Sequence, residues 1–215
     1  MDQSGDNESS EIEAAERRVN ARTATVFRPV LIETAEFSSF CLVRNLSEMG
    51  IMGHVYTDLA ENLPVTIHFG QATKVSGTLV WSAGGRVGVR FRHSVDVDGI
   101  LAVLAAKIVN GKLNRAPRLR IRCHAKLGIG DRTLAIEVQD VSQRGIKITA
   151  SFILPGDELY VEMSGIERRK AIVRWTKDGA AGLHFVRPLS FEQLANWVVD
   201  YQTGKIAELR GMQGL

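Results

Sequence analysis

The sequence predicts a mainly β protein made of two small six-stranded antiparallel barrels in tandem, each followed by a C-terminal α-helix. Three observations predict it: a duplicated set of landmarks, alternation of apolar and polar residues with a period of two, and a helical pattern at the end of each copy. The chain has 215 residues, which is room for two domains of roughly 100 residues each.

The landmarks return after about 95 residues. Asn45-x-Ser47-x-x-Gly50 reappears as Asp140-x-Ser142-x-x-Gly145, and late in each copy a Trp precedes Gly-x-x-Phe. These late landmarks are Trp81 and Phe91 in the first copy, and Trp175 and Phe185 in the second. The offset is 95 residues at the Asn or Asp and 94 at the Trp and Phe. Small loop deletions in a duplicated domain would produce this drift.

Short alternating segments, separated by breaks that contain Gly, Asp or Pro, fill most of each copy. The predicted strands of the first copy are 24–32, 37–45, 50–56, 64–69, 73–82 and 86–92. Those of the second copy are 118–126, 132–140, 145–150, 158–162, 168–175 and 180–186. Pro29 predicts an edge or a bulge in the first strand. Six short strands in roughly 75 residues predict a closed barrel, because closure removes exposed strand edges.

A helical pattern ends each copy. The first helix is predicted over about 96–110, where it stops at Asn110-Gly111, and the second over about 190–209 with Ser190 as its N-cap. Residues 1–15 lack periodicity and are predicted to be a disordered acidic tail. The predicted domains are therefore 16–111 and 112–215.

The charge of the chain is uneven. Its net charge is +3, but residues 1–16 hold six acidic side chains and no basic one. The remainder carries 27 basic and 18 acidic residues, a net charge of +9. An anionic partner is therefore expected, which leaves a nucleotide, a nucleic acid or an acidic protein surface open.

The cysteines, the acidic N-terminal residues and the apolar runs predict the cellular compartment. Cys41 and Cys123 both lie in alternating apolar stretches and are expected to be buried free thiols, which favours the cytoplasm. The acidic beginning is not typical of a secretory signal. Apolar runs stay well below the roughly 18 residues of a membrane span, so none is expected.

Two motifs carry a resemblance to a known family. Arg18-x-x-x-Arg22 precedes the first predicted strand, and Asn45-x-Ser47-x-x-Gly50 follows about twenty residues later. This order, with Trp and Gly-x-x-Phe behind it, resembles the PilZ family over roughly 17–110 and 112–209. The resemblance implies PilZ-like barrels that bind cyclic di-GMP, without a cofactor, in control of motility, exopolysaccharide or related surface behaviour.

The ligand chemistry fits the motif residues. The expected cyclic di-GMP site consists of Arg17, Arg18, Arg22, Asn45, Ser47 and Gly50. A guanidinium can grip a phosphate or the O6/N7 edge of guanine with two parallel hydrogen bonds, so Arg18 and Arg22 are expected in these roles with Arg17 as a helper. Asn45 can both donate and accept, and Ser47 can bond the ligand or its own turn. Gly50 is expected where a Cβ atom would not fit.

The second copy departs from the motif. Its tentative site consists of Arg115, Arg118, Asp140, Ser142 and Gly145. Arg118 corresponds to Arg22, but Asn114 stands where the first Arg is expected. Arg118 and Arg122 also match Arg-x-x-x-Arg, yet they alternate along a strand with Arg120, so this match is interpreted as accidental. A weaker site or an interface is expected there.

Other functions remain as alternatives. One is a protein-interaction adaptor with vestigial sites, and a less favoured one is a nucleic-acid-binding barrel; no nucleic acid is expected as partner in the leading hypothesis. No metal site or nucleophile–base pair is recognised, so an enzyme is not expected. Trp81 and Trp175 are interpreted as core residues. The protein partner, ligand stoichiometry and oligomeric state, including a homodimer, stay open, and the terminal helix is expected on its own barrel or on another subunit.

Overall fold

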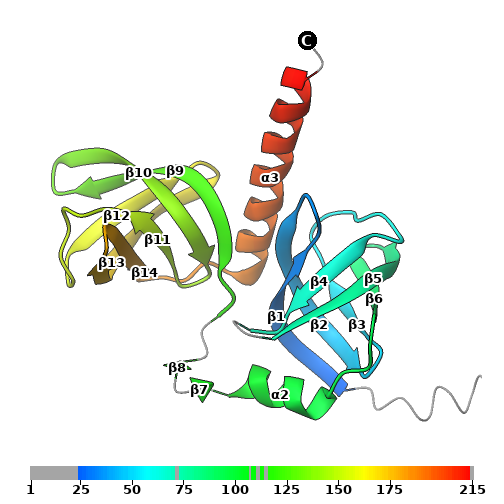
Figure 1. The fold of residues 1–215 in the computed structure, drawn as a ribbon. Coiled ribbons are helices and arrows are strands. Elements are labelled where there is room, and N and C mark those ends of the chain that lie inside the picture. Colours follow the sequence, from blue (N-terminus) through cyan, green and yellow to red (C-terminus); the bar gives the residue numbers. More distant parts are fainter. Residues whose placement is uncertain (1–23, 71–72, 107, 110–111, 114–115, 214–215) are drawn as a thin grey trace, which may run out of the picture.

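The computed structural model describes residues 24–70, 73–106, 108–109, 112–113 and 116–213. Two closed antiparallel barrels of six strands each follow one another along the chain, and a long C-terminal helix stands between them (Figure 1). A short helix follows the first barrel. The predicted fold class is confirmed.

Both barrels have the same strand order. The first contains β1 (Ala24–Glu33), β2 (Ser38–Ser47), β3 (Gly50–His54), β4 (Pro64–His68), β5 (Lys74–Ala83) and β6 (Arg86–Phe91). The second contains β9 (Leu119–Ile129), β10 (Arg132–Ser142), β11 (Gly145–Thr149), β12 (Glu158–Met163), β13 (Ile166–Lys177) and β14 (Ala180–Phe185). Their orders are β1-β2-β3-β6-β5-β4 and β9-β10-β11-β14-β13-β12, closed by the β1–β4 and β9–β12 pairs. The repeat in the sequence is thus a repeat of the whole topology.

Alternation along the strands builds the two cores. In β9 the apolar residues from Leu119 to Leu127 are buried at every second position, while the residues between them are exposed. Cys41 and Cys123 are buried free thiols, as predicted. Burial raises the pKa of Cys41 to about 12.

The strands are interrupted at equivalent places. The register shifts between Val43 and Asn45 in the first barrel, and between Val138 and Asp140 in the second. A matching shift precedes each late Trp, on β5 and on β13. A further shift between residues 25 and 28 stands next to Pro29, where a bulge or edge was expected. Bulges re-aim the side chains that follow them, so the motif residues occupy positions that regular strands would not provide.

The first helix is shorter than the sequence predicted. α2 (Val97–Ala105) begins at Asp96, whose carboxylate accepts a hydrogen bond from the Gly99 amide at 3.0 Å. It ends before Ala106, and the predicted extent to about residue 110 is wrong. β7 (Ile108–Val109) pairs instead with β8 (Lys112–Leu113). Two β-branched residues ahead of Asn-Gly favour a hairpin, and this preference prevails over continuation of the helix.

The second helix is capped as predicted. α3 (Phe191–Gln213) follows Ser190, whose hydroxyl accepts from the Gln193 amide at 3.0 Å, while the Gln193 side chain accepts from the Ser190 amide at 3.2 Å. This reciprocal pair is a capping box. Trp197 Nε1 donates to the Ser164 carbonyl at 2.7 Å, and the Tyr201 hydroxyl donates to the Arg122 carbonyl at 2.9 Å. α3 therefore packs on its own barrel.

The same helix also contacts the first barrel. Phe40 of β2 is only 1% exposed and belongs to the hydrophobic cluster of the second barrel, and its ring meets Phe191 edge-on at 5.9 Å. The Gln202 side chain exchanges two hydrogen bonds with the backbone of Ser38. α3 thus joins the two barrels through both apolar and polar contacts. In the described part of the chain, no helix has the length and apolar character to cross a membrane.

Candidate functional site

The first motif lies at the turn between β2 and β3. The Ser47 hydroxyl donates to the Gly50 carbonyl at 3.1 Å, so this serine bonds its own turn, one of the predicted roles. A Cβ atom on Gly50 would overlap the carbonyl oxygen of Val89 on the neighbouring strand. Glycine is therefore required by the close approach of two backbones. Asn45, which follows the bulge, lies opposite Thr25 of β1 and Met52 of β3.

A shallow hollow of about 300 Å³ opens beside this turn on the outer face of the barrel. Asn45, Ser47 and Gly50 line it together with Met49, Met52, Val80, Trp81 and Arg90. Met49 is 51% exposed and Arg90 is also exposed. The hollow thus combines an apolar floor with an amide, a hydroxyl and one guanidinium. Arg17, Arg18 and Arg22 lie outside the described residues.

The two late tryptophans are not core residues, contrary to expectation. Trp81 is 36% exposed and Trp175 is half-buried. Each indole lies over a glycine of the adjacent strand, Gly88 or Gly182, where a Cβ atom would overlap the ring. Each ring therefore lies flat on the outside of its barrel. The register shift before each Trp turns the side chain away from the core, and alternation alone could not reveal this.

An arginine next to the motif was missed by the sequence analysis. Arg44 immediately precedes Asn45, and its guanidinium lies 4.7 Å from the ring centroid of Phe27, which is 58% exposed. Both residues fall within the register shift of the β1–β2 pair. This cation–π pair presents charge and an aromatic surface close to Asn45. An Arg directly before the motif was the available signal, but its partner on another strand was not visible.

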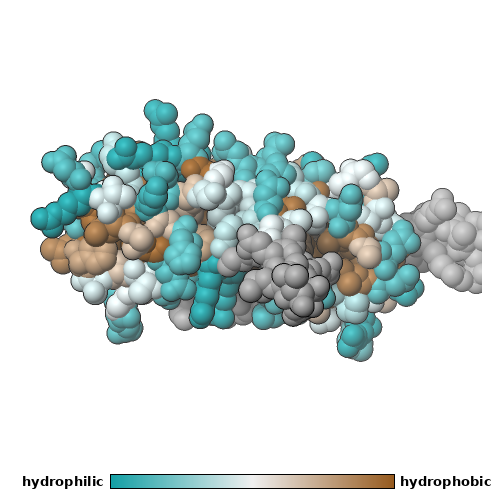
Figure 2. Space-filling view, turned by 90° about the horizontal axis from the view of Figure 1, so that it is seen from above, coloured by the Kyte–Doolittle hydropathy of each residue, from teal (hydrophilic) through white to brown (hydrophobic). Residues whose placement is uncertain are grey.

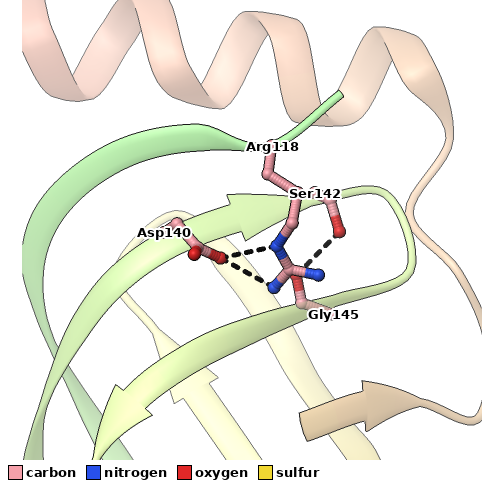
Figure 3. Close-up of polar contacts among 4 residues, drawn as sticks. All are labelled: Arg118, Asp140, Ser142 and Gly145. Atoms are coloured by element: carbon pink, nitrogen blue, oxygen red, sulfur yellow. Dashed lines mark hydrogen bonds and ion pairs between the residues drawn. The ribbon is translucent and has the colours of Figure 1, made fainter. Parts of the chain in front are cut away.

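The second motif has the same turn, and Figure 3 shows it with Arg118 beside Asp140. The Ser142 hydroxyl donates to the Gly145 carbonyl at 3.1 Å, and a Cβ atom on Gly145 would overlap the Leu183 carbonyl. Nε and Nη2 of Arg118 both lie 2.7 Å from Oδ1 of Asp140. The side chains of Arg118 and Asp140 are 29% and 19% exposed, so each neutralises the other in partial burial.

The two arginines that alternate with buried residues after Arg118 lie on β9. Arg120 and Arg122 are exposed on the outer face of β9, while Arg118 precedes the strand. This placement agrees with the interpretation of their spacing as accidental. Arg115, and Asn114 in the place of the missing Arg, lie outside the described residues.

Arg118 and Asp140 also face the first barrel. They line a cavity of about 540 Å³ together with Glu33, His68 and Lys74 of the first barrel. Nε2 of His68 lies 2.6 Å from a carboxylate oxygen of Glu33 at this cavity. The cavity therefore mixes charges of both signs. In the described segments, no group of three or more His, Cys, Asp or Glu side chains is placed to hold a metal ion.

Comparison with known proteins gives one family match. Residues 16–107 match the PilZ domain family. Similar solved structures include PlzA of Borreliella burgdorferi in complex with c-di-GMP (10% identity, 88% of this chain and 99% of that chain, TM-score 0.34). YcgR of Escherichia coli in complex with c-di-GMP has 10% identity over 96% of this chain and 93% of that chain, with a TM-score of 0.34. The inhibitor of motility MotI/DgrA of Bacillus subtilis has 12% identity over 85% and 99%, with a TM-score of 0.33. Among curated proteins no significant match was found.

Proposed function

We propose that this chain, whose residues 16–107 match the PilZ domain family, is a cyclic di-GMP receptor without catalytic activity, and that its first barrel carries the main site. One observation carries the proposal. The family match spans both Arg18-x-x-x-Arg22 and Asn45-x-Ser47-x-x-Gly50, and the second motif lines an open hollow on the outer face of the barrel. The proposed domains are 16–111 and 112–215.

In this proposal the motif residues bind different parts of cyclic di-GMP. Arg18 and Arg22, with Arg17 beside them, bind the phosphates and the O6/N7 edge of guanine, because a guanidinium can form two parallel hydrogen bonds to either. Asn45 reads the polar edge of a base. The apolar floor of the hollow contacts the flat face of a base, because burying that face costs little desolvation free energy.

The output in this proposal is a change in how the first barrel meets the second barrel or a protein partner. In this proposal the ligand joins the arginines of segment 16–23 to the barrel surface near Arg44. Burial raises the pKa of Tyr56; the charge of Glu192 raises it further and that of Arg44 lowers it, so all three side chains are close. The Tyr56 ring contacts Phe191 of α3 at 5.9 Å. This series of contacts connects the first site with α3, and the family resemblance assigns the output to motility, exopolysaccharide or related surface behaviour.

Calorimetric titration with cyclic di-GMP at near-physiological salt, with GTP as the control ligand, tests the proposal. We expect saturable binding of cyclic di-GMP and none of GTP. The affinity for cyclic di-GMP should fall at least a hundredfold in the double variant Arg18→Ala, Arg22→Ala, because about two charge-assisted contacts disappear. Arg86→Ala, an exposed arginine on β6, is the matched control. Unchanged affinity in the double variant would show that the mechanism is wrong.

A second candidate function is a protein-interaction adaptor with a vestigial second site. The closed Arg118–Asp140 pair favours it for the second barrel, because each partner satisfies the charge that a ligand would otherwise meet. One ligand per chain in the titration supports this role for the second barrel, and two per chain contradict it.

A further inference from the structure

The second barrel carries basic side chains where the first barrel has a mostly apolar surface. The equivalence is structural: Phe91 N donates to the Met49 carbonyl at 2.7 Å, and Phe185 N donates to the Arg144 carbonyl at 2.9 Å. Through the same repeat, Arg144, Lys147, Arg174 and His184 stand where the first barrel has Met49, Met52, Val80 and Arg90. We name Arg144, Lys147, Arg174 and His184 the basic face.

Strand pairing brings the basic face together. His184 of β14 lies beside Gly145 of β11 and Ile172 of β13, and Arg144 directly precedes Gly145. Lys147 lies opposite Gly182, over which the Trp175 indole is placed. Arg174 is the residue within the register shift that turns Trp175 outward. The result is a surface that carries the Trp175 indole near four basic side chains, three from strands β11, β13 and β14 and one from the turn before β11.

The charges of the basic face are not compensated within the described residues. Arg118 and Lys170 of the same barrel have carboxylates at 2.7 Å and 2.6 Å, whereas no ion pair involves Arg144, Lys147 or Arg174 in the part of the chain that the structure describes. Burial lowers the pKa of His184, and the charges of Arg174 and Arg144 lower it further, so these side chains stand close enough to repel. A bound anion would relieve this repulsion.

We propose that the basic face is a phosphodiester-binding site, separate from the ligand site of the first barrel. Arg144 and Arg174 would each offer a planar fork to a phosphate, Lys147 a point charge, and Trp175 a surface on which a base can stack. A cyclic dinucleotide and a nucleic-acid strand share this chemistry. Because Arg118 is already paired with Asp140, Arg144 and Arg174 would supply the charge for a phosphate in its place.

The test uses the full chain and two probes at near-physiological salt. One is a fluorescent single-stranded oligonucleotide followed by anisotropy, and the other is cyclic di-GMP followed by calorimetry in the Arg18→Ala, Arg22→Ala background, which removes the proposed first site. The double variant Arg144→Gln, Arg174→Gln is compared with Lys126→Gln, Arg132→Gln, which removes two exposed charges from β9 and β10 of the same barrel.

We expect the Arg144→Gln, Arg174→Gln variant to weaken binding of one probe at least tenfold, while the Lys126→Gln, Arg132→Gln variant binds like the parent. Loss confined to the oligonucleotide identifies a nucleic-acid strand as the ligand, and loss confined to cyclic di-GMP identifies the dinucleotide. Equal losses in the two variants would show a general charge effect and overturn the proposal, as would binding of neither probe by the parent. Because the background lacks the first site, failure here is distinct from failure of the receptor proposal.

Discussion

The two barrels share the turn of the motif and differ in the side chains next to it. In each, a serine hydroxyl bonds the carbonyl of the glycine three residues later at 3.1 Å, and the glycine allows a neighbouring backbone to approach. In the first barrel the preceding Asn45 borders an open, largely apolar hollow. In the second, Asp140 is held by Arg118. The Ser and Gly of the motif therefore stabilise the same turn in both barrels, whereas the residues beside the turn differ.

The exposed surface repeats this difference. Figure 2 shows a largely hydrophilic face on which hydrophobic atoms gather in two places, one over each barrel. The exposed apolar side chains of the first barrel include Met49, Val80 and Trp81 beside its motif. Those of the second include Phe152 and Leu154, in the loop between β11 and β12. Exposed apolar side chains thus line the hollow at the first motif.

The largest expected effect is a loss of unfolding free energy in variants of the two motif glycines, which test whether the shared turn is structural. Gly145→Ala places a Cβ atom on the Leu183 carbonyl at a residue whose φ is +157°, and we expect a loss of about 3 kcal/mol in unfolding free energy. Gly50→Ala, which meets the Val89 carbonyl, should cost a similar amount. Chemical denaturation measures both.

Gly84→Ala is the control for these variants, because φ is +56° there and no atom lies within 4 Å of the added Cβ. It should cost only about 1 kcal/mol. If Gly50→Ala and Gly145→Ala cost no more than this control, the two glycines are not required by backbone approach, and a ligand would be the better explanation of the motif.

The next prediction separates the second barrel from the first. Arg118→Ala leaves the Asp140 carboxylate, 19% exposed, without the guanidinium that donates twice to its Oδ1, and should lower the unfolding free energy by about 1–3 kcal/mol. Arg122→Ala is the control, because its 3.9 Å pair with Glu137 involves a side chain that is 87% exposed and should contribute below about 1 kcal/mol.

Adding Asp140→Asn to Arg118→Ala gives the second barrel the amide found at Asn45. This change should recover most of the lost stability, because it removes the uncompensated charge. A double variant as unstable as Arg118→Ala alone would show that the arginine acts through packing instead of charge.

The sequence predicted what depends on local pattern. The twelve strands, the Ser190 cap and the two buried thiols all follow from alternation and capping chemistry. What could not be predicted depends on partners distant in the chain. The Arg44–Phe27 pair requires two strands to shift register together, and the burial of Phe40 depends on a helix about 150 residues later. The outward tryptophans follow from bulges, which leave no mark in an alternating pattern.

The smallest expected effect concerns protonation of the basic face. Burial, then the charges of Arg174 and Arg144, lower the pKa of His184 below its ordinary value of 6.5, so between the two values the unfolded chain binds more protons at this position than the folded protein. The contribution of His184 to stability is therefore complete above about pH 6.5 and declines as the pH falls from 6.5 to the pKa of the folded protein.

Arg174→Gln removes one repelling charge and should raise the pKa of His184, measured by NMR titration of its ring protons, whereas Arg132→Gln should leave it unchanged. A phosphodiester bound between Arg144 and Arg174 should raise the same pKa in the parent, because a negative charge favours the imidazolium.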